Sequence, residues 1–153
     1  MAIRTLLRYG GYKPSGRGRP ASEFLLKAWP LPSIHPVVDF FNKVSAESGF
    51  PISVLDAEKL QGATEFREGT AQESYVFNAS GQELKLEGLL VVCDQVGPAG
   101  SPVKDSQRTK VSDDTREFFV VVWGTSELAP RLREVGARIE DWSYRIGSSL
   151  FRV

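Results

Sequence analysis

The pattern of apolar and polar positions is clearest between residues 34 and 51. Pro36 suits the first turn of a helix because its φ is fixed and it has no N–H. Apolar side chains then recur at helical spacing, and charged residues are left for the opposite face. The apolar positions are Val37, Val38, Phe41 and Val44. Gly49 supplies the positive φ that ends a helix, and Pro51 prevents the helix from resuming. The pattern predicts a helix over residues 36–48.

Two further helices are expected on either side of this one. Ser22 is placed to cap a helix over residues 22–29, whose apolar side chains we expect to be buried. A last helix is predicted over residues 126–135 and ended by Gly136. The tail that follows, residues 137–153, carries enough apolar side chains to form one more strand.

Between the central and last helices the pattern changes to short β-prone runs. Residues 52–55 predict a strand, after which Asp56 caps a brief helical turn over residues 57–60. Four runs separated by glycine-containing turns predict an antiparallel meander. They span residues 64–67, 74–78, 83–87 and 89–94. Residues 118–123 are continuously apolar, as is typical of a strand covered on both faces. Helices at both ends of a strand-rich centre predict an α+β fold, with antiparallel or mixed sheets flanked by a few helices.

Length and composition fit one folded domain preceded by a basic arm. The chain has 153 residues and is 41% hydrophobic, which is enough to fill a core. Residues 8–20 contain no acidic residue and are rich in Gly, Pro and Arg. We therefore expect residues 1–20 to be a flexible basic arm and residues 21–153 to be the domain. Its candidate RNA-binding residues, for contact with phosphates or stacking on a base, are Arg8, Tyr12, Arg17 and Arg19. A solvated lead-in loop is the alternative.

Charge and cysteine content narrow the classes of function. Lys and Arg together number 19, as do Asp and Glu, so no global positive field indicates nucleic acid, and any nucleic-acid contact would use a local patch. The single cysteine, Cys93, lies in an apolar run, which favours a buried, reduced thiol. One cysteine cannot form an internal disulfide and no signal peptide is evident, so we expect a cytoplasmic protein. No apolar stretch approaches the length of a membrane span.

Catalytic and cofactor motifs are few. One His and one Cys, well apart in sequence, offer no usual ligand spacing, and no phosphate-binding glycine motif is present, so neither a metal nor a cofactor is expected. His35 would have to serve any nucleophilic triad, because it is the only imidazole. Since it directly precedes Pro36 at a helix start, we predict a capping or surface role for it instead.

Residues 95–110 are the best functional candidate on physical grounds. They follow a predicted buried strand and concentrate Gly, Pro and charged residues, and loops positioned by a rigid scaffold often carry function. The candidate catalytic residues are Lys104, Asp105 and Ser106. Cations in this loop could hold the terminus of an RNA or a carboxylate, Asp105 could hold an amino group, and Ser106 could orient a water molecule. A polar surface loop with ordinary charges is the alternative.

The order and spacing of several motifs resemble the B3/B4 domain. This is the editing module of the phenylalanyl-tRNA synthetase β subunit, and it also occurs in small free-standing proteins. The matching segments are Pro20 and Ser22, Ile34 to Val44, Pro51 to Asp56, Lys59 and Leu60, and Thr115 before Phe118 to Val122. The resemblance covers roughly residues 18–124. Because free-standing relatives usually have more chain before this point, it implies that an N-terminal part of the family's domain is missing here.

The resemblance implies a free-standing hydrolase that deacylates a misacylated tRNA in trans. It aligns residues 95–110 with the Gly-rich wall of the editing pocket. The candidate substrate-binding residues near that wall are Asn42, Ser45, Ser53, Asp94 and Lys110. The implied partner is tRNA or aminoacyl-tRNA, with no cofactor. The alternative is a non-catalytic module that binds tRNA, a free amino acid or a protein.

Two departures from the family pattern bear on the substrate. Ser53 stands where the editing motif has a histidine, and Val121 stands where it has a glutamate. The family's Gly-Gly pair falls near Asp105 and Ser106. The residues that would position a mischarged tyrosine are therefore not retained, which puts specificity for that substrate in doubt. Editing of this type relies on a positioned water and on the terminal ribose rather than on an obligatory side-chain nucleophile, so the departures are compatible with hydrolysis of another substrate.

Overall fold

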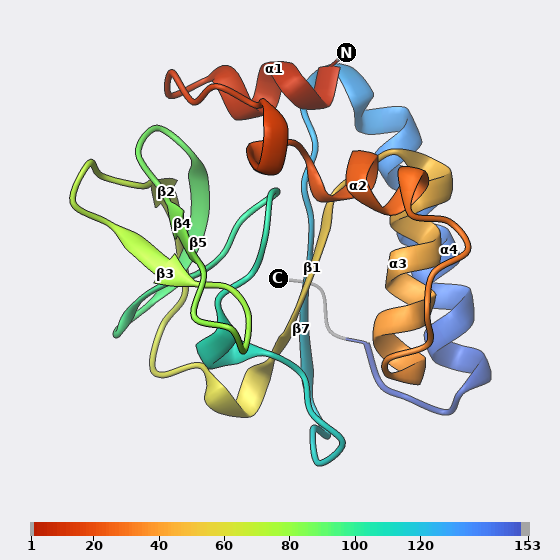
Figure 1. Ribbon diagram of the computed structural model, residues 1–153. Coiled ribbons are helices and arrows are strands. Elements are labelled where there is room, and N and C mark those ends of the chain that lie inside the picture. Colours follow the sequence, from red (N-terminus) through yellow and green to blue (C-terminus); the bar gives the residue numbers. More distant parts are fainter. Residues whose placement is uncertain (1, 151–153) are drawn as a thin grey trace.

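The computed structural model describes residues 2–150, and within that range the chain has an α+β fold, as predicted (Figure 1). The helices are α1 (Ala2–Arg8), α2 (Ala21–Lys27), α3 (Pro36–Ser48) and α4 (Ala129–Arg145). The strands are β1 (Ile52–Asp56), β2 (Glu65–Glu68), β3 (Ser74–Val76), β4 (Glu83–Lys85), β5 (Leu90–Asp94), β6 (Gly97–Gly100) and β7 (Phe118–Val122). Short 3₁₀ turns lie at η1 (Gly16–Gly18), η2 (Ala57–Lys59), η3 (Gln107–Thr109) and η4 (Ser126–Leu128).

The antiparallel pair of β1 and β7 forms the middle layer of the molecule (Figure 1). Alternate side chains of the two strands point to opposite faces. On one face, Val54 and Val120 belong to a cluster with α3 and α4. On the other face, Leu55 and Val121 pack with Val92 of β5. β7 therefore has packing on both faces, but the predicted full burial is not found, because each of its residues stays partly exposed.

The remaining strands lie on the side of β1 and β7 away from α3 and α4 (Figure 1). They form a three-stranded sheet in the order β2-β5-β6 and a separate β3–β4 hairpin. The predicted meander is wrong in one respect, because β2 pairs with β5 and the hairpin is inserted between them. Residues 95–110 are also more ordered than a loop, since they contain β6 and η3, and residues 99–103 are buried.

The central helix matches its prediction over residues 36–48. His35 caps it, because its Nδ1 accepts a hydrogen bond from the Val37 amide at 3.2 Å. Gly49 ends it in the left-handed conformation at φ 82°. Phe41 and Val44 of this helix are buried against Ile139 of α4. The sequence pattern was sufficient here because capping, spacing and termination all agree.

The other two predicted helices require corrections. α2 begins at Ala21, so Ser22 lies in its first turn and its side chain does not cap the helix. Phe24 and Leu26 are 55% and 63% exposed, not buried. α4 continues through Gly136 to Arg145, because the apolar spacing persists and Trp142 stacks on Phe40 with ring centroids 4.0 Å apart. The strand predicted after residue 136 is therefore helix up to residue 145, and residues 151–153 lie outside the described chain.

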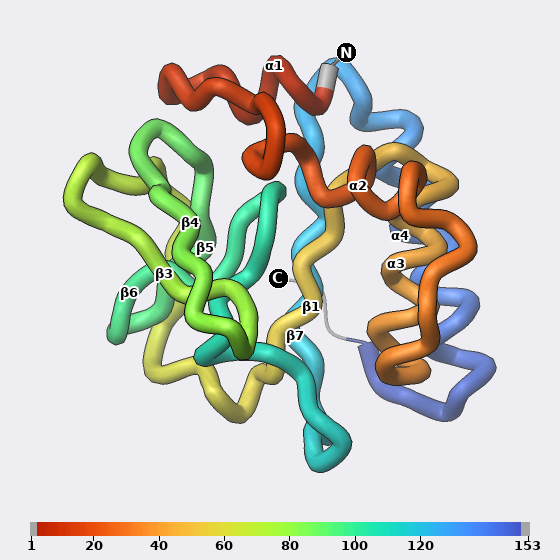
Figure 2. The backbone as a smooth tube through the Cα atoms, in the orientation of Figure 1, coloured from red at the N-terminus to blue at the C-terminus, as the bar shows by residue number. Residues whose placement is uncertain are grey.

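The N-terminal segment is packed on the rest of the fold. Leu7 of α1 is fully buried in a core cluster. Arg4 donates two hydrogen bonds to Glu23 at 2.7 and 2.6 Å and so joins α1 to α2. Figure 2 shows the chain after α1 passing out over the β2–β6 region and returning to α2. The division of the chain at residue 20 stays a prediction.

Two glycines set the path of this segment where it passes the β4–β5 turn. A Cβ on Gly10 would lie 2.5 Å from the Gly88 carbonyl oxygen, and a Cβ on Gly88 would lie 2.1 Å from the Gly10 carbonyl oxygen. Gly88 also has a φ of +68°, which other residues rarely adopt. The contact of two backbones therefore requires glycine at both positions.

Candidate functional site

A pocket of about 360 Å³ opens between α2, α3 and the turn that joins β3 to β4. Four of the predicted site residues line it, namely Asn42, Lys104, Asp105 and Lys110. The remaining lining is mostly apolar and comes from Ala21, Phe24, Leu25, Ile52, Phe77, Asn78 and Val103. We call this cavity the Asp105 pocket. It is a hollow with apolar walls and several convergent polar groups, and polar groups that converge on an apolar hollow are typical of a small-molecule site.

Asp105 is held from behind by a chain of hydrogen bonds. Its Oδ1 accepts from the Ser53 hydroxyl at 2.6 Å, and the Ser53 oxygen accepts from Trp123 Nε1 at 2.8 Å. The Ser101 amide donates to the same Oδ1 at 3.4 Å. Ser53 is therefore a support for the carboxylate and does not itself line the pocket.

The environment of Asp105 changes its acidity. Burial raises the pKa of the Asp105 carboxyl from 3.8 to about 7, although the hydrogen bond from Ser53 acts in the opposite direction. At neutral pH such a group exists in both protonation states. A carboxyl of this kind can take a proton from water and give it back, which is what a general base and acid must do.

Two lysines lie at the rim of the same pocket. The Lys104 ammonium is 5.1 Å from the ring centroid of Phe24 and 5.0 Å from that of Phe77. Lys110 donates from Nζ to the Phe77 carbonyl at 2.6 Å. Burial lowers the pKa of Lys104, and the positive charges of Lys110 and Arg17 lower it further. Burial likewise lowers the pKa of Lys110, against the attraction of Asp105.

Ser106 and Ser45 are not brought to the pocket. The Ser106 hydroxyl caps η3 by accepting from the Arg108 amide at 3.3 Å, and Ser106 lines a separate hollow beside β3 and β6. Ser45 is buried in α3 and donates to the Phe50 carbonyl at 2.6 Å. In this structure both serines make local bonds that support the fold, which leaves Lys104 and Asp105 as the candidate catalytic residues that share the pocket.

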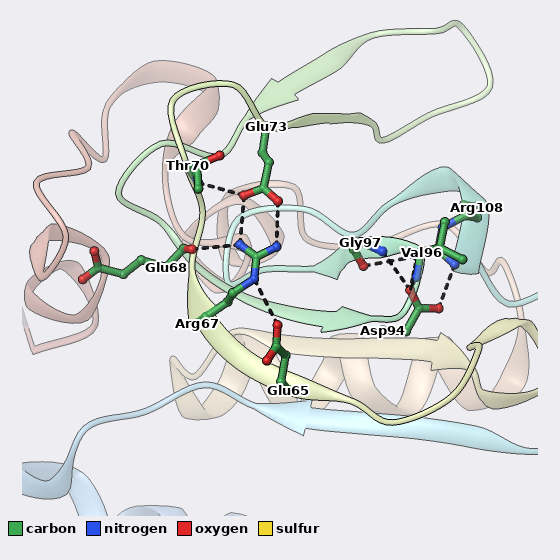
Figure 3. Close-up of polar contacts among 9 residues, drawn as sticks. All are labelled: Glu65, Arg67, Glu68, Thr70, Glu73, Asp94, Val96, Gly97 and Arg108. Carbon is green, nitrogen blue, oxygen red and sulfur yellow. Dashed lines mark hydrogen bonds and ion pairs between the residues drawn. The ribbon is translucent and has the colours of Figure 1, made fainter.

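Asp94 belongs to an internal ion pair and is not a lining residue of the pocket (Figure 3). Two nitrogens of Arg108 each donate to the Asp94 carboxylate at 2.9 Å. The Gln61 and Val96 amides donate to it as well, each at 2.9 Å. Burial by itself would raise the pKa of Asp94, but the hydrogen bonds, led by that from Arg108, outweigh burial and hold the pKa at about 2.

A second ion-pair cluster lies in the same region and is also structural (Figure 3). Arg67 of β2 donates to both oxygens of Glu73 at 2.9 and 2.7 Å and to Glu65 at 3.2 Å. The bond to Arg67 holds the pKa of Glu73 at about 2, even though burial opposes it. This cluster joins β2 to the start of the β3–β4 hairpin, whose turn borders the Asp105 pocket.

Part of the predicted basic arm, residues 1–20, lies along hollows that adjoin the Asp105 pocket. Hollows of about 760 and 330 Å³ both share Lys104 and Phe77 with the Asp105 pocket. Tyr12 lines the larger one, Arg19 the smaller one and Arg17 both. Arg8 lines a further hollow together with Tyr12. We call the two hollows and the pocket together the groove. Three of the four predicted RNA-binding residues therefore line one groove that ends at Asp105.

Several residues of this site were missed from the sequence. Phe24 was expected to be buried by its helix, and it is instead exposed at the pocket rim. Trp123 was assigned only to a buried strand, and its hydrogen bond to Ser53 joins residues 70 positions apart. Nothing in the local sequence predicts this hydrogen bond, because strand pairing brings the two distant residues together.

The part of the chain that the structure describes contains neither a metal-ligand cluster nor a membrane-spanning helix. Across residues 2–150, no group of three or more His, Cys, Asp or Glu side chains is placed to hold a metal ion. None of the helices in that range has both the length and the apolar character needed to cross a membrane.

Comparison with known proteins defines the class. The sequence model of the B3/4 domain matches residues 21–146, and the chain belongs to the B3/4 domain family, which confirms the resemblance. The phenylalanine-tRNA ligase beta subunits of Brucella abortus (strain 2308) and Brucella suis biovar 1 (strain 1330) are each 30% identical to it over 125 residues. The match covers 78% of this chain and 15% of each relative, so the chain spans about 15% of the length of the curated relatives it matches.

Proposed function

We propose that the protein hydrolyses the ester bond of a misacylated aminoacyl-tRNA, acting in trans as a deacylase. The observation that carries the proposal is Asp105, a carboxyl with a pKa of about 7 in a pocket at the end of a groove lined by Arg17 and Arg19. The relatives are named as subunits of a tRNA ligase, which supports tRNA as the partner. We expect the activity in the cytoplasm, where tRNA is charged.

The reaction follows from the chemistry of the pocket. An ionised Asp105 accepts a proton from a water molecule while the water oxygen attacks the carbonyl carbon of the ester. The tetrahedral intermediate then breaks its bond to the oxygen of the terminal ribose, and Asp105 returns the proton to that oxygen. The products are the free amino acid and a tRNA with a free terminal hydroxyl. No covalent intermediate with the protein is needed.

Other pocket residues have supporting roles in this scheme. Lys110, and Lys104 at the rim, supply positive charge for the oxygen that becomes negative in the intermediate. Asn42 offers an amide to the amino acid, and the apolar wall accepts its side chain. Ser53 and Trp123 fix the carboxylate of Asp105 by their hydrogen bonds.

One of the two departures from the family pattern contacts this carboxylate. Ser53 is the direct cross-strand partner of Val121 in the β1–β7 pair. The two positions that lack the family's histidine and glutamate are therefore neighbours, and one of them bonds to Asp105. This arrangement supports a substrate different from mischarged tyrosine. It also supports the second candidate function, a module that binds tRNA, an amino acid or a protein without catalysis.

The test is amino-acid release from a panel of correctly and wrongly charged tRNAs. We expect the protein to deacylate one mischarged species faster than the others, with a rate that rises with pH through about 7 as Asp105 ionises. Asp105→Asn should slow release by a factor of about 100 or more. Asp113→Asn, which changes an exposed acid in a turn, is the matched control and should retain the rate.

Two results would contradict hydrolysis by this pocket. One is an Asp105→Asn protein that deacylates at the parent rate. The other is a parent protein that retains tRNA in a mobility-shift assay but releases no amino acid, which would favour the binding module.

A further inference from the structure

The smaller hollow of the groove, with a volume of about 330 Å³, has features that the hydrolysis scheme does not use. Two aromatic rings reach it from different elements, Phe24 from α2 and Phe77 from the turn after β3. The Phe24 side chain is free enough to act as a platform, because the residue is 55% exposed. We call this cavity the aromatic hollow. Aromatic rings at a solvent-accessible surface are the usual stacking partners of unpaired bases.

Positive charge surrounds these rings. Arg17, Arg19 and Lys104 line the aromatic hollow, and none of its lining residues in the described chain is acidic. Arg19 uses Nε to bond the Gly16 carbonyl at 2.8 Å, which leaves its terminal nitrogens for an anion. Rings together with positively charged side chains match a base and its phosphate.

The aromatic hollow directly adjoins the Asp105 pocket. The two cavities share Phe24, Phe77, Asn78, Val103 and Lys104. In an aminoacyl-tRNA the ester is carried by the ribose of the last nucleotide. If the amino acid occupies the Asp105 pocket, the base of that same nucleotide must lie in the next cavity along the groove.

We propose that the aromatic hollow is the subsite for the 3′-terminal adenosine of tRNA, with its base stacked on Phe24 and Phe77 and its phosphate bound by Arg17 and Arg19. The orientation of the nucleotide rests on the proposed function. The Lys104 ammonium now lies over both rings, at 5.1 and 5.0 Å from their centroids. A stacked base takes its place, and the ammonium turns into the adjoining Asp105 pocket, which Lys104 also lines. Earlier nucleotides then follow the larger hollow, past Arg17 and Tyr12.

The experiment measures binding without chemistry, with uncharged oligonucleotides in fluorescence anisotropy at one fixed salt concentration. The probes are ACCA, ACC and free AMP. We expect the protein to bind ACCA more tightly than ACC and AMP. Phe24→Ala should weaken ACCA binding between about fivefold and a hundredfold, the range for loss of one stacked base, and should leave ACC binding unchanged.

Two variants control for indirect effects. Leu26→Ala removes a similarly exposed apolar side chain from the same helix, outside the groove, and should retain ACCA affinity. Phe24→Trp keeps an aromatic ring and should also retain it. Equal affinity for ACCA and ACC, or equal ACCA affinity of the parent and Phe24→Ala, would overturn the subsite. AMP that binds as tightly as ACCA would also overturn it, in favour of a free-nucleotide site.

The failure of this inference can be told apart from failure of the proposed function. Phe24-dependent ACCA binding by a protein that deacylates no tRNA would support the subsite and overturn hydrolysis. Deacylation by Phe24→Ala at the parent KM would overturn the subsite and leave hydrolysis intact.

Discussion

Asp94 and Asp105 lie eleven positions apart, and the fold shifts their pKa values in opposite directions. Asp94 is surrounded by donors and faces the guanidinium of Arg108, so its pKa is held at about 2. Asp105 is held by hydroxyl and amide donors and lies next to apolar walls, so burial raises its pKa to about 7. Burial opposes ionisation at both residues, and only Asp94 has a bidentate cation to overcome it.

This difference separates a structural carboxylate from a candidate catalytic one. A shifted pKa alone does not mark a functional site, because ion pairs within the fold also shift pKa values. The direction of the shift is more informative here. A carboxylate with a lowered pKa stays charged and stabilises the fold, whereas one with a pKa near neutrality can exchange protons with a substrate.

The largest expected effect comes from breaking the Asp94 pair. Asp94→Asn leaves Arg108 without its partner and should lower the free energy of unfolding at pH 7 by about 3–5 kcal/mol. Urea denaturation measures the loss. Asp141→Asn is the control, because the Asp141–Arg145 pair is largely exposed at 62% and 74%, and its loss should cost less than about 1 kcal/mol. Similar losses in the two variants would refute a special role for the Asp94 pair.

A smaller, pH-dependent effect is expected at Asp105. Since its folded pKa exceeds the unfolded value of 3.8, its contribution to stability is fully present below about pH 4 and is lost as the pH rises through about 7. Asp105→Asn removes this titration. The stability of the variant relative to the parent should therefore increase by about 2–3 kcal/mol between pH 5 and pH 8. Denaturant unfolding at several pH values tests this, and a pH-independent difference would contradict it.

The smallest effect tests the support of Asp105. Ser53→Ala removes a bond that favours the charged carboxylate, so the pKa of Asp105 should rise further and the pH–rate profile should move to higher pH. The unpaired Trp123 N–H should cost about 1–2 kcal/mol of stability. Ser45→Ala, which removes a buried hydroxyl bonded to a carbonyl, should cost a similar amount and leave the profile unmoved.

The sequence predicted the parts of the fold that local chemistry determines. The α3 helix was correct at both ends because His35, Pro36 and Gly49 act within a few residues of the backbone they direct. The α+β class and the family were also predicted. The insertion of the β3–β4 hairpin between β2 and β5 was not, since strand pairing depends on contacts between distant residues.

The site was predicted in part for the same reason. Lys104, Asp105 and Lys110 were found because they lie close together in the sequence, and Asn42 was found through the resemblance. The roles of Ser53 and Asp94 could not be told apart from pattern alone, because both are polar groups next to strands. Phe24 was misplaced because its helix does not bury all of its apolar residues.

The short segment from Asp105 to Lys110 combines structural and pocket residues, and this arrangement bears on how the protein can evolve. Within six positions it carries the pocket carboxylate, the Arg108 that anchors Asp94 and the Lys110 at the pocket rim. The anchor fixes the backbone on which the two pocket residues are displayed. As long as Asp94 and Arg108 are kept, we expect substitutions in the pocket to leave the fold intact. A single family could in this way acquire new substrates by small steps.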